Sequence, residues 1–173
     1  MNEDIAQNTL DARQDDSGVI VNTTTGLVKG FLSESSLGKP VRVFYGIPYA
    51  MPPTGSRRFS PPKPHDPWPG VFDATIKPNS CMQTIDEFYG NFSGSVMWNA
   101  NTDRSEDCLK LNVWAPISPE ECVAVLVWIY GGGFYSGTST LDVYDARRLG
   151  CGGERDRRID ELPRRVPRVP LVR

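Results

Sequence analysis

The sequence predicts a mainly parallel β-sheet of the kind found in α/β proteins, reached through a short antiparallel meander. Between Val19 and Tyr49, short segments alternate apolar and polar side chains and are separated by turn residues, which is typical of half-buried antiparallel strands. Residues 122–130 are apolar without alternation, which is typical of a strand buried on both faces in the middle of a parallel sheet. A chain of 173 residues is long enough for one domain with a proper core.

The meander is expected to contain three strands, with a turn at 24–26 and a polar loop at 33–39; the strands are 19–22, 27–31 and 41–45. A further alternating strand is expected at 109–115. Between these strands, residues 48–78 hold nine prolines, which lack the amide donor that helices and central strands require. Phe59, Trp68 and Phe72 favour an ordered irregular loop laid over a surface, rather than a linker.

Charge and composition exclude several classes of function. The net charge of −2 argues against a general polyanion binder, and no run of 18 apolar residues exists that could span a membrane. Residues 1–18 are expected to be a flexible acidic leader, because they lack the basic and apolar regions of a signal peptide. The single histidine, His65, excludes any mechanism that needs two.

The cysteines and the glycosylation sequons indicate whether the protein is secreted. Cys81 and Cys108 enclose 26 residues rich in aromatics and glycine, and we expect a disulfide because such an irregular segment needs a constraint; two unrelated thiols are the alternative. The sequons at Asn22 and Asn91 predict glycosylation and favour secretion, although no signal peptide is visible.

The chemical centre of the sequence is the junction at which the apolar strand meets Gly131-Gly132-Gly133. Glycines leave the backbone open to approach, so that amide groups there could hold an oxyanion. Phosphate binding is the alternative, but neither of the usual glycine-rich phosphate motifs is present. A plain glycine turn is the simplest interpretation of three glycines alone.

Four motifs in register resemble the type-B carboxylesterase family, and especially its cholinesterases, from about Val19 to Arg147. They are the oxyanion loop at 131–137 after Val127-Trp-Ile-Tyr130, the second signature at 105–113, the N-terminal block at 44–59 and the loop at 94–99. Lys110 departs from the Tyr or Thr that is usual in the second signature. The resemblance implies the N-terminal portion of an α/β-hydrolase fold (an antiparallel meander leading into the central sheet, incomplete here) and hydrolysis of choline esters such as acetylcholine, with no cofactor, metal or nucleic acid.

The resemblance also assigns roles to individual residues. Gly132 and Gly133 would be the oxyanion donors, and Trp98 would be the cation–π platform for the quaternary ammonium. Asp86 would attract the cation at the rim of the gorge, and Tyr130 and Tyr135 would line it. Without the resemblance, Trp98 reads as a core residue, Asp86 as a solvated carboxylate and the tyrosines as packing residues.

Three structural features follow from the same resemblance. Arg58 and Glu106 would form an ion pair at the base of the loop, and the Cys81–Cys108 bond would match the family's first disulfide, which supports an extracellular location. Thr84 stands where many cholinesterases carry an aromatic residue of an outer site, so that site would be weakened. Cys122 has no family partner.

The catalytic machinery of a serine esterase is missing from these 173 residues. No G-x-S-x-G motif occurs, and His65 lies in the proline-rich loop, where the family has no catalytic base. We therefore expect residues 19–147 to be a partial domain that is inactive alone. A non-catalytic binding or adhesion module of the same fold is the alternative.

The resemblance stops at Arg147, and residues 148–173 contain eight arginines and three prolines. A basic nucleic-acid-binding tail is one interpretation; our hypothesis is a frameshifted or mispredicted end, because a one-nucleotide shift of permitted codons restores family-like residues. Sequencing the transcript across the codons for Ala146 to Cys151 tests it, and the hypothesis fails if no shifted frame leads to a G-x-S-x-G segment. With its neighbour missing, the apolar strand would offer an open edge, which predicts poor solubility.

Overall fold

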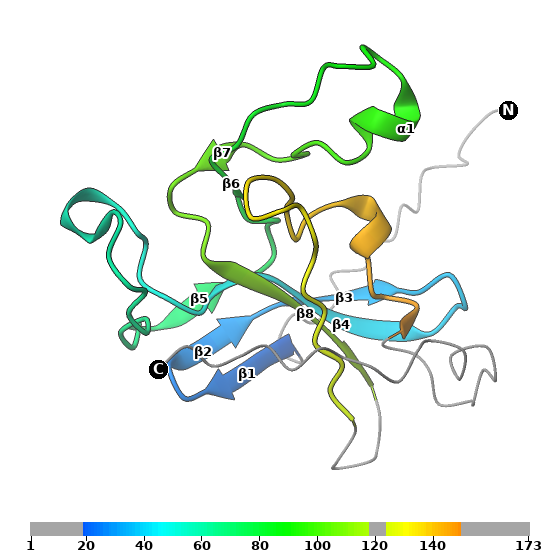
Figure 1. Cartoon of the computed structure of the whole chain (residues 1–173). Coiled ribbons are helices and arrows are strands. Elements are labelled where there is room, and N and C mark those ends of the chain that lie inside the picture. Colours follow the sequence, from blue (N-terminus) through cyan, green and yellow to red (C-terminus); the bar gives the residue numbers. More distant parts are fainter. Residues whose placement is uncertain (1–18, 118–123, 150–173) are drawn as a thin grey trace, which may run out of the picture.

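The computed structural model describes residues 19–117 and 124–149, and these form three small sheets joined by irregular segments (Figure 1). Strand is the main regular structure in the described part of the chain, and the helices there are single turns: α1 (Ser93–Val96), η2 (Gly55–Arg57) and η3 (Asp142–Tyr144). None of the described helices is long and apolar enough to cross a membrane.

The first sheet has the order β1-β2-β5, with β1 (Ile20–Thr23) antiparallel to β2 (Gly26–Lys29) and β5 (Val71–Asp73) parallel to β2. Its core is the cluster of Val19, Val28, Phe44 and Ala74. Trp68 packs against this cluster, and its indole Nε1 donates a hydrogen bond to the carbonyl oxygen of Leu27 over 2.9 Å. The sheet is therefore stabilised by burial of apolar side chains and by the hydrogen bond from the Trp68 indole.

The second sheet has the order β3-β4-β8, formed by β3 (Phe31–Glu34), β4 (Pro40–Pro48) and β8 (Lys110–Pro116). Both pairs are antiparallel, and β4 lies in the centre with Val41 and Val43 fully buried. A bulge interrupts the register between Phe44 and Ile47. There, the Gly46 amide, at a φ of 70°, donates to the Asn112 side-chain oxygen over 3.0 Å.

The expected meander is thus correct for the antiparallel pairs β1–β2 and β3–β4, but it is not one continuous sheet. The single strand expected at 27–31 is divided at Gly30, and β3 extends into the loop expected at 33–39. The chain changes sheets at Gly30, between β2 and β3. A side chain at Gly30 would collide with the carbonyl oxygen of Val43 and the ring of Phe44, so only glycine permits this close crossing. Alternation predicted the strands, but it carries no information about which strands pair.

The proline-rich stretch is an ordered surface segment, as predicted. Trp68 and Phe72 pack against the first core, and the His65 ring meets Trp68 edge-on with centroids 5.7 Å apart. Phe59 differs from the expectation because it is fully exposed, with only the Arg58 guanidinium over its ring.

The Cys81–Cys108 disulfide is present and closes the segment between them. At its base, β6 (Ser80–Cys81) pairs in parallel with β7 (Arg104–Ser105), and α1 lies in the outer part of the segment (Figure 1). The predicted closed loop is therefore confirmed. Cys122 and Cys151 lie outside the described residues, as do the leader and the tail from residue 150.

The apolar segment 124–130 corrects the main fold expectation. It forms no strand, and the side chains of Val125 to Ile129 are between 67% and 85% exposed. A strand buried on both faces requires hydrogen-bonded neighbours and covering layers, and among the described strands none pairs with this segment. The edge strand β8 shows the same lack of cover on one face, because Leu111 and Val113 are 39% and 37% exposed.

Candidate functional site

The glycine loop at 131–137 turns through left-handed backbone conformations, which glycine adopts most easily. Gly132, Gly133 and Gly137 have φ values of 137°, 61° and 104°. A Cβ at Gly132 would collide with the carbonyl oxygen of Ser136, and the amides of Tyr135 and Ser136 both donate to the Gly132 carbonyl, over 3.2 and 3.1 Å. The loop therefore curls back on its own second glycine, and a substitution there would strain it.

The curl leaves the Gly132 and Gly133 amides without an acceptor in the described part of the chain. Gly133 is exposed and Gly132 is partly exposed. Two adjacent free amide donors are what an oxyanion requires, since each can donate to the same negatively charged oxygen. The predicted donors are therefore open to a ligand, although their role stays a prediction.

A buried hydroxyl network holds the chain that follows this loop. Thr138 Oγ1 lies 2.9 Å from both Ser80 Oγ and Thr140 Oγ1, and Thr140 Oγ1 donates to the Asn101 side-chain oxygen over 2.6 Å. Ser80, Thr138 and Thr140 are all less than 6% exposed. This network ties the loop to the base of the disulfide-closed segment.

Two of the three rings predicted to bind substrate, Trp98 and Tyr130, lie around Tyr144, a residue that the sequence analysis did not single out. The Tyr144 ring centroid lies 6.5 Å from that of Trp98, 5.5 Å from Trp128 and 6.4 Å from Tyr130. Burial raises the pKa of Tyr130, and the nearby Tyr49 and Tyr144 hydroxyls raise it further. No local sequence pattern marks Tyr144, because it meets these rings only through the path of the chain.

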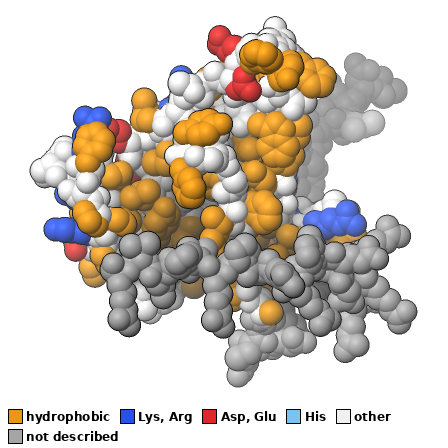
Figure 2. Space-filling model, viewed as in Figure 1, with side chains coloured by type: hydrophobic (Ala, Val, Ile, Leu, Met, Phe, Trp, Pro, Cys, Tyr) orange, Lys and Arg blue, Asp and Glu red, His pale blue; other side chains and the backbone are white. Residues whose placement is uncertain are grey.

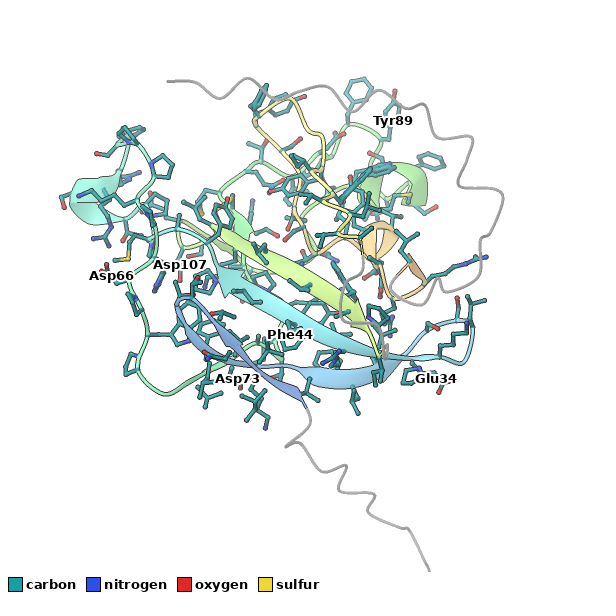
Figure 3. All side chains as sticks on the ribbon, turned by 90° about the horizontal axis from the view of Figure 1, so that it is seen from below. Glu34, Phe44, Asp66, Asp73, Tyr89 and Asp107 are labelled. Atoms are coloured by element: carbon teal, nitrogen blue, oxygen red, sulfur yellow. A yellow bond between two sulfur atoms is a disulfide. The ribbon has the colours of Figure 1, made fainter. Side chains whose placement is uncertain are left out.

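Trp98 is half exposed and lines an open cavity of about 270 Å³ together with Tyr89, Phe92, Gly94 and Ser95. Figure 2 shows hydrophobic side chains gathered over the α1 segment and the neighbouring part of this face. In Figure 3, Tyr89 lies far from the sheet residues Phe44 and Asp73. Trp98 is thus an accessible surface ring rather than a core tryptophan.

The other predicted binding residues, Asp86 and Tyr135, lie outside the cluster of rings around Tyr144. Asp86 is exposed; its carboxylate accepts from the Phe88 amide over 2.9 Å, and its own amide donates to the Asn99 side chain over 2.9 Å. That bond places Asp86 beside the residue that follows Trp98. Tyr135 is exposed at the tip of the glycine loop, and Thr84 is exposed as well.

The predicted ion pair is present, with Arg58 Nε 2.7 Å from Glu106 Oε1. Asn22 and Asn91 are both exposed, so each sequon is accessible, and their modification stays a prediction. Across residues 19–117 and 124–149, no group of three His, Cys, Asp or Glu side chains is arranged to hold a metal ion.

The sequence profile of the carboxylesterase family matches residues 17–151. The chain belongs to this family. It is 57% identical over 117 residues to acetylcholinesterase 1 of Caenorhabditis elegans, and 54% identical over 130 residues to the cholinesterase of Mus musculus. It is also 51% identical over 140 residues to the acetylcholinesterase of Leptinotarsa decemlineata.

These matches cover 66%, 75% and 74% of this carboxylesterase chain, but only 19%, 21% and 22% of the respective relatives. The chain thus spans about a fifth of the length of the curated relatives it matches. The family implies an α/β-hydrolase fold, and a described part whose regular structure is mainly strand agrees with an N-terminal portion of that fold.

Proposed function

We propose that the chain is the N-terminal part of a cholinesterase-like serine hydrolase and that, alone, it does not hydrolyse choline esters such as acetylcholine. One observation carries the proposal: Tyr144 links the Trp98 ring to Tyr130, and the residue after Tyr130 begins the glycine loop. These ring contacts connect the predicted cation-binding ring to the loop that carries the two free amides, and a substrate with a quaternary ammonium and an ester carbonyl would need both groups.

The Trp98 ring and the two amides would each contribute a different interaction. The face of Trp98 attracts a quaternary ammonium through the ring quadrupole, with a gain of about 2 kcal/mol when the cation is desolvated. The Gly132 and Gly133 amides would stabilise the negative charge that develops on the ester oxygen when a nucleophile attacks. The exposed carboxylate of Asp86 would draw the cation toward the ring over a longer range.

The groups that carry out covalent chemistry are absent from this sequence. No G-x-S-x-G motif is present, and His65 Nδ1 lies 2.7 Å from the carbonyl oxygen of Asp66, in the proline-rich segment. Oxyanion donors without a nucleophile and a base provide no efficient covalent route. The disulfide and the two exposed sequons support an extracellular location for the parent protein.

The test is a chimera in which residues 19–147 replace the matched segment of the mouse cholinesterase. We expect it to hydrolyse acetylthiocholine. Trp98→Ala should lower kcat/KM for acetylcholine about 30-fold, which corresponds to about 2 kcal/mol. The matched control is 3,3-dimethylbutyl acetate, the neutral isostere, whose hydrolysis should change little.

An equal loss on both substrates would contradict the cation-binding role of Trp98. The native 173-residue chain should show no turnover of acetylthiocholine, and measurable hydrolysis would refute the absence of a nucleophile. If a longer transcript exists, the residue in its nucleophile elbow separates an enzyme from a non-catalytic binding module.

A further inference from the structure

Gln83 makes a two-way hydrogen-bonded pair with the backbone of Gly137, at the end of the glycine loop. Gln83 Nε2 donates to the Gly137 carbonyl oxygen over 2.9 Å, and the Gly137 amide donates to Gln83 Oε1 over 2.9 Å. One side chain thus satisfies both polar groups of a single residue, in the way a partner strand would. Asparagine is too short to span this distance in the same way, and a carboxylate would lack the donor.

Gln83 is itself held in place from the disulfide-closed segment. Its Nε2 also donates to the carbonyl oxygen of Cys81 over 3.1 Å, and Arg104 donates to the Gln83 backbone oxygen over 2.8 Å. The side chain is partly buried, and it emerges two residues after a half-cystine. Its orientation is therefore determined by the base of the loop rather than by solvent.

Gly137 in turn lies against the start of the glycine loop. A Cβ at Gly137 would come within 2.7 Å of the Gly131 carbonyl oxygen and 2.9 Å of the Tyr130 ring. This close approach closes the loop, so a shift of Gly137 would also move Gly131. A group that holds Gly137 would therefore restrict the two amides that follow Gly131.

We propose that Gln83 is the positioning residue of the oxyanion loop and aims the Gly132 and Gly133 amides through its pair with Gly137. This inference rests on the proposed function for the use of those amides, but its geometric part is independent of catalysis. Gln83 touches no reacting atom in this scheme; it acts by preventing the loop from relaxing when charge develops on the oxygen.

The first measurement uses the native 173-residue chain and needs no activity. In Gln83→Met, which keeps the size of the side chain and removes its hydrogen bonds, we expect exchange of the Gly137 amide with solvent to accelerate at least about tenfold. The Gly132 and Gly133 amide resonances should shift as well. The matched control is Thr138→Val, which breaks the hydroxyl network and leaves the Gln83–Gly137 pair intact.

The second measurement uses the chimera with the mouse cholinesterase and separates positioning from general stability. Gln83→Met should lower kcat for acetylthiocholine and the affinity for a trifluoromethyl ketone, which forms a tetrahedral oxyanion, each by about 10- to 100-fold. Binding of tetramethylammonium, which needs only the aromatic face, should stay within about twofold.

Unchanged Gly137 exchange in Gln83→Met overturns the inference whether or not the chimera is active. A parallel loss of tetramethylammonium and ketone binding also overturns it, because that pattern indicates general unfolding. A chimera without any hydrolysis contradicts the proposed function alone, and the exchange measurement then still decides the role of Gln83.

Discussion

Removing the Cys81–Cys108 disulfide should lower the free energy of unfolding by about 3.5 kcal/mol. The bridge joins residues 27 apart in sequence. In the chain-entropy estimate, closure of a loop of that length restricts the unfolded chain by about 2.1 + 1.5R ln 27 in cal/mol/K, which gives this figure at 25 °C. A loss of that size is a large fraction of the 5–15 kcal/mol that is typical of native domains.

The perturbation is the double variant Cys81→Ser with Cys108→Ser. Both this variant and its control also carry Cys122→Ser and Cys151→Ser, so that no alternative bridge forms in either protein, and the control keeps the Cys81–Cys108 bridge. Urea unfolding of both proteins is followed by tryptophan fluorescence and far-UV circular dichroism, and the free energies are extrapolated to water. A difference below about 1 kcal/mol would refute the reasoning, because the bridge would then not restrict the unfolded chain as the calculation assumes.

Two further predictions concern charge and solubility. Burial alone would raise the pKa of Asp145, but hydrogen bonds from the side chain and amide of Arg147 outweigh it and lower this pKa. Asp145 therefore contributes stability above its unfolded pKa of about 3.9, and this contribution is lost as the pH falls through the lower folded value. The stability difference between the native chain and Asp145→Asn should shrink between pH 6 and pH 2 in thermal melts, and a constant difference would contradict the assignment. Val127→Lys should raise the soluble yield of the chain, because it places a charge in the exposed apolar segment 124–130. The control is Lys29→Arg, which keeps the charge of a residue in β2, and an equal yield for all three proteins would count against the segment as the cause of aggregation.

Strand positions were predictable where one face of a strand is covered and the other is not. The alternation in 109–115 predicts β8, and the paired apolar runs on each side of 24–26 predict the β1–β2 hairpin. The same reasoning was wrong at 124–130. An unbroken apolar run indicates that a strand would have to be covered on both faces, but it does not show whether the pairing strands and covering layers are present. Pairing across Gly30 was also beyond prediction, since it depends on a backbone crossing.

The candidate site divides in a similar way. Gly132, Gly133 and Trp98 are recognisable because their residue types in that order form motifs, and the Cys81–Cys108 bond is expected because the irregular segment between these cysteines needs a constraint. Gln83 and Tyr144 belong to no motif, and neither is remarkable among its sequence neighbours.

The sequence by itself determined the family of this chain, the glycine loop and the disulfide, because these depend on residue identity and short-range order. Only the tertiary structure decided that Gln83 forms two hydrogen bonds with Gly137 and that the Tyr144 ring lies between those of Trp98 and Tyr130. The physical reason is that hydrogen bonds and ring contacts depend on separations of a few ångströms. Residues 54 positions apart reach such separations only once the disulfide-closed segment and the glycine loop have folded against each other.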